Sequence, residues 1–487
     1  MQYDLLIKNV HVVRPNEHCA RVADIAIAGE KFAKIEENIP AGESKSVYDG
    51  KGWLAFPGVV DAHMHTGIYA PLAEDAVSES RAAAQGGVTS SLNYFRSGQY
   101  YLNKGGPYRQ FFPEVLELSA GRFHVDYGYH LAPMDSTHIA EIPELIERHG
   151  VASFKIFMFY GSHGLHGRSD AQREFLMIGP EQRYDYAHFE FIMRGVQAAR
   201  ERFADKAQQI SLSLHCETAE IMTAYTKIVE SQKNLEGLAA YHAARPPHSE
   251  GLAVFVAAYL PNETALSAIN LLHLSSRKAL EAALQMQALF PHIDFRREVT
   301  IGHLMLDTDS KAGVLAKVNP PIRPREDVEF LWEKLLEGKV DWVVSDHACC
   351  RHETKAARQA FGNIWLAKSG FGGTEYLLPA LVSEGARRGL SYNRMARLSS
   401  WNPARRFGLN SKGDIAEGLD ADLALVDPRE SWTVRARQSA STQGYTPFEG
   451  IELGARVKAT FLRGALVCEN GNPVGKPRGR YLHRPTA

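Results

Sequence analysis

Cysteine is scarce in this sequence. The 487 residues include five cysteines, an odd number without regular spacing. A small secreted domain held together by disulfides needs an even set at short spacings, so the cysteine content excludes that class of protein. Cys349 and Cys350 are adjacent. We interpret them as ordinary thiols, and a soft metal site at this pair is the alternative.

The sequence also lacks a long hydrophobic run and an excess of charge. Its longest apolar run, 252–260, is far shorter than the roughly 20 residues of a transmembrane helix. The first residues have neither the basic nor the apolar stretch of a signal peptide. Lys and Arg number 55 against 56 for Asp and Glu, so the basic excess of a nucleic-acid-binding protein is missing. We therefore predict a cytoplasmic protein with no membrane or nucleic-acid partner.

What the chain does contain is a globular composition and many histidines. Hydrophobic residues make up 45% and charged residues 23%, which excludes disordered and fibrous classes. The 20 histidines are more than a fold needs for itself, and imidazole serves as a metal ligand and as an acid or base near neutral pH. The composition therefore directs attention to metal or acid–base chemistry.

Both ends of the chain have strand-like alternation, whereas the long middle alternates short apolar strands with helical stretches. We predict an α/β protein with a (β/α)8 TIM-like barrel over 56–405. A smaller β-sandwich domain is expected from 1–55 together with 406–470, followed by a C-terminal tail, 471–487. The tail is rich in Pro, Gly and Arg, and we expect it to extend over a neighbour or to stay mobile.

Eight candidate strands support the barrel. They are Gly58–Asp61, Val88–Tyr94, Phe123–Leu131, Ala152–Phe159, Ile210–His215, Ala268–Leu274, Arg297–His303 and Asp341–Asp346. Catalytic residues of such barrels lie at the carboxyl ends of the strands. The chemistry is therefore expected where these strands end.

Metal-binding side chains occur at five of these strand ends. The first strand leads into His63 and His65, which are two residues apart and therefore point the same way in an extended chain. The fifth, sixth and eighth end near His215, His273 and Asp346. Each histidine alone is more often a satisfied polar residue, but one barrel mouth would gather all of them. Imidazole and carboxylate are the usual ligands of zinc and similar metals.

The fourth strand contributes a lysine. Lys155 lies inside Ser153–Met158, an otherwise apolar segment, where a charged amine is costly unless it is neutralised or modified. One interpretation is a lysine that reaches the surface. The other is a deprotonated amine that adds CO2, because the resulting carbamate is a carboxylate able to bridge two cations.

These residues, in this order, resemble the binuclear amidohydrolase superfamily. The match is closest to its cyclic-amidase branch of dihydropyrimidinases, hydantoinases and allantoinases. The segments that carry it are 56–65, 154–158, 318–323, 345–347, 402–404 and 412–418. The resemblance implies that His63, His65 and Asp346 bind one metal, that His215 and His273 bind a second, and that Lys155 bridges them as N6-carboxylysine. It implies two divalent ions, with zinc expected, and a homo-oligomer, a dimer or tetramer.

The expected reaction is the hydrolytic opening of a cyclic amide, ureide or imide. Two metals lower the pKa of a bridging water, and the hydroxide attacks the amide carbon. Asp346 is expected to take the proton and to pass it to the leaving nitrogen. The resemblance assigns Tyr160 to the developing oxyanion. It also offers His303, Asn319, Phe371 and Gly372 as substrate contacts.

Some alternatives remain. The segment 161–184 is longer than expected of hydantoinases and is interpreted as a mobile lid, an enlarged pocket wall or a surface insertion. Linear amide hydrolysis or deamination are the alternative chemistries, although deaminases of the superfamily usually lack the carboxylated lysine. A non-catalytic dihydropyrimidinase-like scaffold is disfavoured because all six ligand positions are filled.

Overall fold

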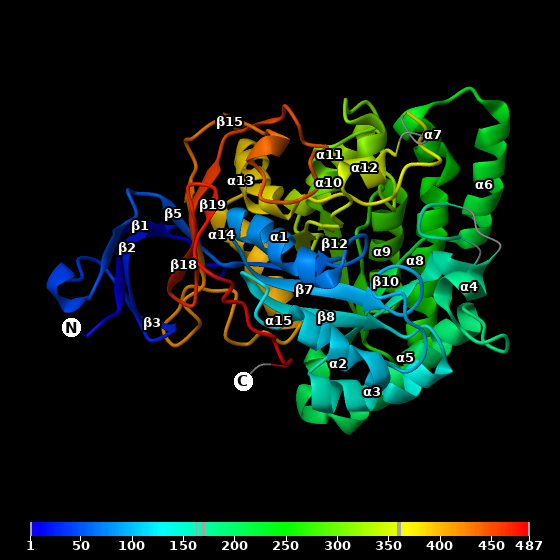
Figure 1. Ribbon diagram of the computed structural model, residues 1–487, viewed down its shortest axis with the longest axis horizontal. Coiled ribbons are helices and arrows are strands. Elements are labelled where there is room, and N and C mark those ends of the chain that lie inside the picture. The colour runs from blue at the N-terminus through cyan, green and yellow to red at the C-terminus, as the bar shows by residue number, and fades with distance from the viewer. Residues whose placement is uncertain (1, 162, 168–170, 358–361, 486–487) are drawn as a thin grey trace.

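The computed structural model describes residues 2–161, 163–167, 171–357 and 362–485. A parallel barrel with its covering helices forms the larger body, and a smaller β domain lies at one side, where the N-terminal and C-terminal strands meet (Figure 1). Residue 162 and residues 168–170 of the predicted insertion lie outside the described part. Among the described helices, none is both long and apolar enough to cross a lipid bilayer.

Eight parallel strands form the barrel, in the order β13-β12-β11-β10-β9-β8-β7-β6. Their bounds are β6 Val59–Met64, β7 Val88–Arg96, β8 Asp126–Ala132, β9 Ser153–Phe157, β10 Ser211–His215, β11 Ala268–Leu271, β12 Asp294–Thr300 and β13 Trp342–Val344. β13 returns to β6 through the pairing of Met64 with His347, and the His65 N–H donates to the His347 carbonyl at 2.7 Å. All eight predicted strands are therefore present, and the (β/α)8 architecture is confirmed.

Helices surround this barrel. They are α1 Leu72–Gln85, α2 Tyr108–Ser119, α3 Ser136–His149, α4 Gln172–Leu176, α5 Tyr186–Arg202, α6 Ala219–Gln232, α7 Gly237–Ala244, α8 Pro247–Thr264, α9 Arg277–Leu289, α10 Ile301–Met305, α11 Arg325–Leu336, α12 His352–Lys355, α13 Leu377–Arg387, α14 Tyr392–Ala396 and α15 Asn402–Arg406. Most barrel strands are buried along their whole length. Both faces of these strands are covered, so their polar residues are buried as well, such as Ser211 and Ser213 of β10.

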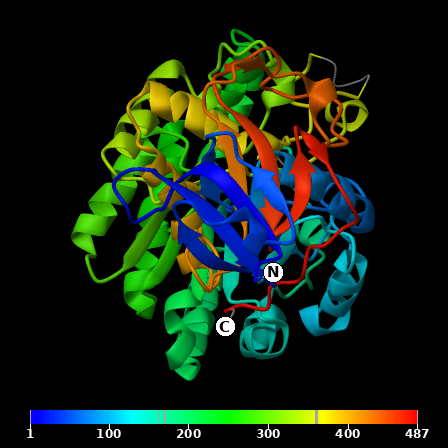
Figure 2. The same ribbon diagram turned by 90° about the vertical axis from the view of Figure 1, so that its left-hand side faces the viewer.

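The smaller domain combines strands from both chain ends. Its nine-stranded sheet contains β1 Leu5–Val12, β2 Arg21–Ala28, β3 Lys31–Glu36, β4 Val47–Asp49, β5 Leu54–Pro57, β14 Leu423–Asp427, β17 Arg456–Leu462, β18 Ala465–Glu469 and β19 Asn472–Pro473. β5 pairs with β14, so the blue N-terminal and red-to-orange C-terminal strands lie side by side (Figure 2). A separate pair, β15 Trp432–Thr433 and β16 Glu452–Leu453, completes the strands.

One apolar cluster packs residues of β1, β2 and β3 against residues of β14 and β17. Strands of the two chain ends thus share a core, although all nine are hydrogen-bonded within a single sheet. The passage into the barrel falls at Gly58, between β5 and β6. An added Cβ at Gly58 would lie 2.1 Å from Thr89 Oγ1, so the close approach of this connection to β7 requires glycine.

The expectation that the C-terminal tail stays mobile is wrong over its described residues. The tail packs on the barrel of its own chain, where Leu482 N donates to the Tyr127 carbonyl at 2.7 Å and Tyr127 N donates to the Arg480 carbonyl at 3.0 Å. Arg484 is buried and donates to Ser153 Oγ at 2.8 Å. The low hydrophobicity of the tail concealed this, because arginine and backbone groups make the contacts.

Candidate metal centre

The side chains predicted at the strand ends converge at one mouth of the barrel. Asp346 Oδ1 lies 3.2 Å from both His63 Nε2 and His65 Nε2. The rings of His215 and His273 have their centroids 4.2 Å apart, and His273 lies 5.4 Å from His63. All five side chains are buried. The chain thus brings together imidazoles and a carboxylate from four strands and from the ends that follow them.

Lys155 lies in the middle of this group. It points from β9 with its Nζ 3.1 Å from His63 Nε2, and Tyr94 and Phe157 place ring centroids 4.0 and 4.3 Å from that nitrogen. Burial lowers the pKa of Lys155 to about 7, although Asp346 and Glu298 act in the opposite direction. The lysine does not reach the surface, and its amine is held close to the neutral form that can react with CO2.

Three of the histidines have one ring nitrogen occupied. His63 donates from Nδ1 to Glu298 Oε1 at 2.7 Å, and His215 donates from Nε2 to Glu217 Oε2 at 2.7 Å. His65 Nδ1 shares a 2.7 Å hydrogen bond with the Tyr101 hydroxyl. Partners of this kind fix the ring orientation and leave the other nitrogen for a metal.

His273 supplies the most direct test of whether the site suits cations. Both of its ring nitrogens are buried and have no hydrogen-bond partner among the described residues. Burial lowers its pKa well below the ordinary value, so the ring is neutral and can act as a ligand. Because an unsatisfied buried polar group is costly, a divalent cation fits this donor set.

The sequence did not predict the residues that form hydrogen bonds with the candidate ligands. Glu298 on β12 accepts from His63, from Trp342 Nε1 at 2.9 Å and from the His273 backbone N–H at 3.1 Å. Glu217 is held by Arg245, whose Nε lies 2.9 Å from Glu217 Oε1. A carboxylate two residues after His215 was a visible signal for Glu217. For Glu298, the signal was a carboxylate within the predicted strand Arg297–His303, to which no metal ligand had been assigned.

Asp346 is supported from behind by its neighbour His347. Asp346 has a positive φ of 55°, an uncommon backbone conformation that requires support. His347 Nε2 donates to Glu79 Oε2 at 2.8 Å, and the Gly373 N–H donates to His347 Nδ1 at 3.0 Å. Since Nδ1 accepts a backbone N–H, the ring carries its proton on Nε2.

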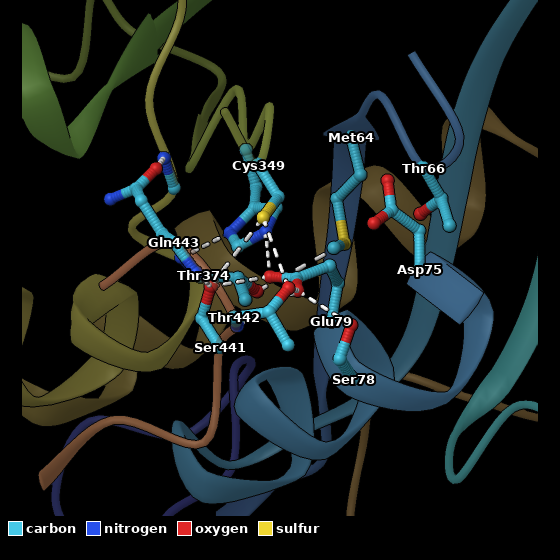
Figure 3. Close-up of polar contacts among 12 residues, drawn as sticks. Met64, Thr66, Asp75, Ser78, Glu79, Cys349, Thr374, Ser441, Thr442 and Gln443 are labelled. Atoms are coloured by element: carbon cyan, nitrogen blue, oxygen red, sulfur yellow. Dashed lines mark hydrogen bonds and ion pairs between the residues drawn. The ribbon is translucent and has the colours of Figure 1, made fainter. Parts of the chain in front are cut away.

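Glu79 on α1 is the centre of this support. Its carboxylate also accepts from Ser78 Oγ at 2.7 Å, from Ser441 Oγ at 2.6 Å and from Thr442 N and Oγ1 at 3.2 and 3.1 Å. Figure 3 shows Ser441 and Thr442 reaching Glu79 from a separate loop of the chain. Burial acts to raise the pKa of Glu79, but the hydrogen bonds from His347 and from the serine hydroxyls lower it to about 2.

Asp75 and Cys349 also lie close to Glu79, with potential ligand atoms within 4.8 Å of one another (Figure 3). This cluster differs from the strand-end site because both Glu79 oxygens already accept from hydrogen-bond donors. Burial further raises the pKa of the Cys349 thiol far from the range in which it would act as a thiolate. The geometry is that of a hydrogen-bonded support rather than of a metal site.

A cavity of about 50 Å³ opens beside the candidate ligands. Its walls include Tyr160 and Asn319, two of the predicted substrate contacts. Tyr160 lies in the 3-10 turn Met158–Gly161, and burial raises its pKa against the opposing charge of Arg96. Leu165 of the predicted insertion also lines the cavity, and its carbonyl accepts from Asn319 Nδ2 at 2.8 Å. The described part of the insertion therefore contributes to the pocket wall.

The other three predicted contacts lie outside the cavity lining. The predicted strand to His303 ends at Thr300, and His303 lies on α10 with both nitrogens engaged, by Thr300 Oγ1 at 2.7 Å and the Pro320 carbonyl at 3.1 Å. Phe371 packs beside Gly302, and the Gly372 N–H donates to Gln443. Ser369 and Gly370 of the same loop line the cavity instead. The loop was correctly placed, but the residues facing the cavity differ from those named.

A barrel mouth that gathers four imidazoles, a carboxylate and a buried lysine is a donor set suited to divalent cations. Residues 187–467 match the model of the amidohydrolase family. The chain is 32% identical over 99% of its length to allantoinases of Salmonella newport and Salmonella typhimurium, each covered over 99%. The chain belongs to the amidohydrolase family.

Solved structures agree in fold. A dihydropyrimidinase from Brevibacillus agri is 25% identical, with a TM-score of 0.83 and 98% of both chains covered. An L-hydantoinase from Arthrobacter aurescens is 25% identical, with a TM-score of 0.84, and covers 98% of this chain and 99% of that one. The predicted resemblance is thereby confirmed.

Proposed function

We propose that this protein opens the ring of a cyclic amide, ureide or imide by hydrolysis. The observation that carries the proposal is the convergence of His63, His65, His215, His273 and Asp346 around Lys155. The relatives named allantoinase, dihydropyrimidinase and hydantoinase support a ring substrate.

The side chains fit two divalent cations, with zinc the metal we expect. His63, His65 and Asp346 would hold one, His215 and His273 the other, and Lys155 would join them after carboxylation to N6-carboxylysine. The low pKa of the Lys155 amine and the unsatisfied nitrogens of His273 support this assignment. When bound, such a pair supplies Lewis acidity to the amide carbonyl and lowers the pKa of water.

Two side chains of the protein then transfer the proton and stabilise the negative charge that develops on the carbonyl oxygen. Water adds to the amide carbon while Asp346 accepts its proton, since surrounding cationic and imidazole groups keep this buried carboxylate ionised. As the carbon–nitrogen bond breaks, Asp346 returns the proton to the leaving nitrogen. Tyr160 donates its phenolic proton in a hydrogen bond to the carbonyl oxygen as charge develops there. The product is the ring-opened acid.

Other chemistries have less support. Deamination or linear amide hydrolysis would use the same barrel, but the buried Lys155 favours the ring-opening branch. A non-catalytic scaffold would have no reason to keep His273 buried with both ring nitrogens unsatisfied.

We also propose that the chain assembles as a homo-oligomer, a dimer or tetramer. Large apolar side chains remain exposed on α8 and α9: Phe255 is 37%, Tyr259 55% and Leu289 62% exposed. These residues line one hollow of almost wholly apolar character, and a second copy could cover it. Light scattering of the purified protein measures the mass directly.

The function is tested with metal-loaded protein and a panel of hydantoins, dihydropyrimidines, cyclic imides and allantoin. Ring opening appears as a carbamoyl or amidic acid by mass spectrometry, whereas deamination releases ammonia. Ammonia without a ring-opened acid would reject the proposal. Metal analysis by plasma mass spectrometry is run on the same sample, and a metal-free protein after gentle purification would favour the scaffold.

A further inference from the structure

Arg96 is a buried cation with few hydrogen-bond partners. It is the last residue of β7, at the same barrel mouth as the candidate ligands, and is 1% exposed. Nη1 donates to the Ser97 carbonyl at 2.8 Å, whereas Nε and Nη2 have no hydrogen-bond partner among the described residues. Within the same described ranges, no carboxylate forms an ion pair with it, in contrast to Arg245, which pairs with Glu217.

Other buried arginines are better satisfied. Within the described part of the chain, Arg463 and Arg484 leave only Nε without a hydrogen-bond partner, and their other nitrogens reach carboxylate, hydroxyl or carbonyl oxygens elsewhere in the fold. Arginine remains charged at any physiological pH, and a buried unpaired charge is expensive. Two open nitrogens on one buried guanidinium therefore require an explanation.

Arg96 does not itself line the cavity, but two of the rings that contact it do. Its guanidinium carbon lies 5.7 Å from the ring centroid of Tyr101, 5.1 Å from Tyr160 and 4.6 Å from Phe175. Tyr101 and Tyr160 both line the cavity beside the candidate ligands. The three rings offset part of the cost of burying the charge, but they do not satisfy two N–H directions.

We propose that Arg96 binds a carboxylate carried by the substrate, so that the ring opened by this protein is an anionic one. This inference rests on the proposed ring-opening function and narrows its substrate class. A guanidinium with adjacent Nε and Nη2 free presents the planar pair of donors that a carboxylate accepts with both oxygens. The substituent would enter between Tyr101 and Tyr160 while the amide faces the metal ligands. A neutral ring would leave the two donors unsatisfied.

The test compares two rings that differ only in charge: a hydantoin with a carboxymethyl group at C5 and its carboxamide counterpart. The metal-loaded protein is expected to prefer the carboxylate by about 30-fold in kcat/KM, the effect of one charged hydrogen-bonded pair. Arg96→Met should remove this preference chiefly through KM, and Arg96→Lys should retain part of it. Arg148→Met, a change at an exposed arginine of α3, is the matched control and should keep the preference.

The outcomes separate the two proposals. If neither ring opens, and no other ring in the panel does, the proposed function fails. If the carboxamide opens as fast as the carboxylate, the proposed function survives and the role of Arg96 is overturned. An equal loss on both rings in Arg96→Met would also overturn it, because Arg96 would then only support Tyr160. Melting temperature and metal content of each variant show whether the fold and site are intact.

Discussion

Replacing Glu79 with glutamine should weaken both the fold and the catalytic site, for reasons visible in its hydrogen bonds. One carboxylate oxygen accepts from His347 and Ser441, and the other from Ser78 and Thr442. An amide group at the first position would face the His347 N–H, which cannot move to Nδ1 because Gly373 donates there. At the second position it would face the Thr442 backbone N–H. Either orientation opposes one donor that cannot reverse, because hydroxyl groups can rotate to accept but these N–H groups cannot.

The magnitude follows from the pKa of Glu79. Its folded value of about 2 lies below the ordinary value of 4.5. The carboxylate therefore contributes stability that is complete above pH 4.5 and is lost as the pH falls towards 2. The shift corresponds to about 3 kcal/mol. Glu79→Gln should lower the free energy of unfolding at pH 7 by about that amount. The free energy of unfolding of the variant should also fall less than that of the unsubstituted protein when the pH is lowered.

The assay is urea unfolding at pH 7 and pH 4, followed by tryptophan fluorescence, with kcat measured in parallel. Because His347 adjoins Asp346, we expect kcat to fall by at least about 10-fold, as when a positioning hydrogen bond is lost. Glu74→Gln, an exposed position on the same helix, should change neither quantity. Stability and kcat within error of the unsubstituted protein in Glu79→Gln would refute this reasoning.

Three further outcomes are expected. Lys155→Ala should bind less than one metal ion per chain instead of about two and lose turnover; normal activity without added short carboxylic acids would contradict the bridging role. Tyr160→Phe should lower kcat by about 100-fold with little change in KM, since only the developing oxyanion needs the phenol; a loss confined to KM would reassign it to binding. Lys412→Met should cost about 3–5 kcal/mol in urea unfolding, because it leaves the buried Asp422 without its cation, whereas Asp126 keeps its ion pair with Arg463. The exposed Lys31→Met, which also removes an ion pair, should cost at most about 1 kcal/mol; equal losses would show that burial does not decide the effect.

The order of strands and the identity of the strand-end residues were predictable because a barrel imposes both. Continuous apolar runs mark buried parallel strands, and a histidine or aspartate at the end of such a run must face the mouth. His63, His215 and Asp346 were found in this way, whereas Lys155 was noticed as a charged residue inside a buried strand. Strand ends themselves were less certain: β12 stops at Thr300, where the hydroxyl accepts from the His303 N–H and begins a helix.

The supporting residues were harder to predict because they depend on contacts between distant segments. Glu79 and Ser441 are separated by 362 positions in the chain, and no local pattern relates them. Arg96 is the last residue of a strand that already contains several polar residues, and only the structure shows that two of its nitrogens lack partners among the described residues. The tail was misjudged for a similar reason, since its contacts use backbone groups and Arg484 rather than an apolar face.

The loop that carries Ser441 and Thr442 lies beyond every barrel strand in the sequence, yet it supplies three of the donors to Glu79. A nascent chain on the ribosome therefore holds a nearly complete barrel in which this carboxylate still lacks those donors. The position of the aspartate among the candidate ligands therefore depends on a segment that is synthesised after all of them.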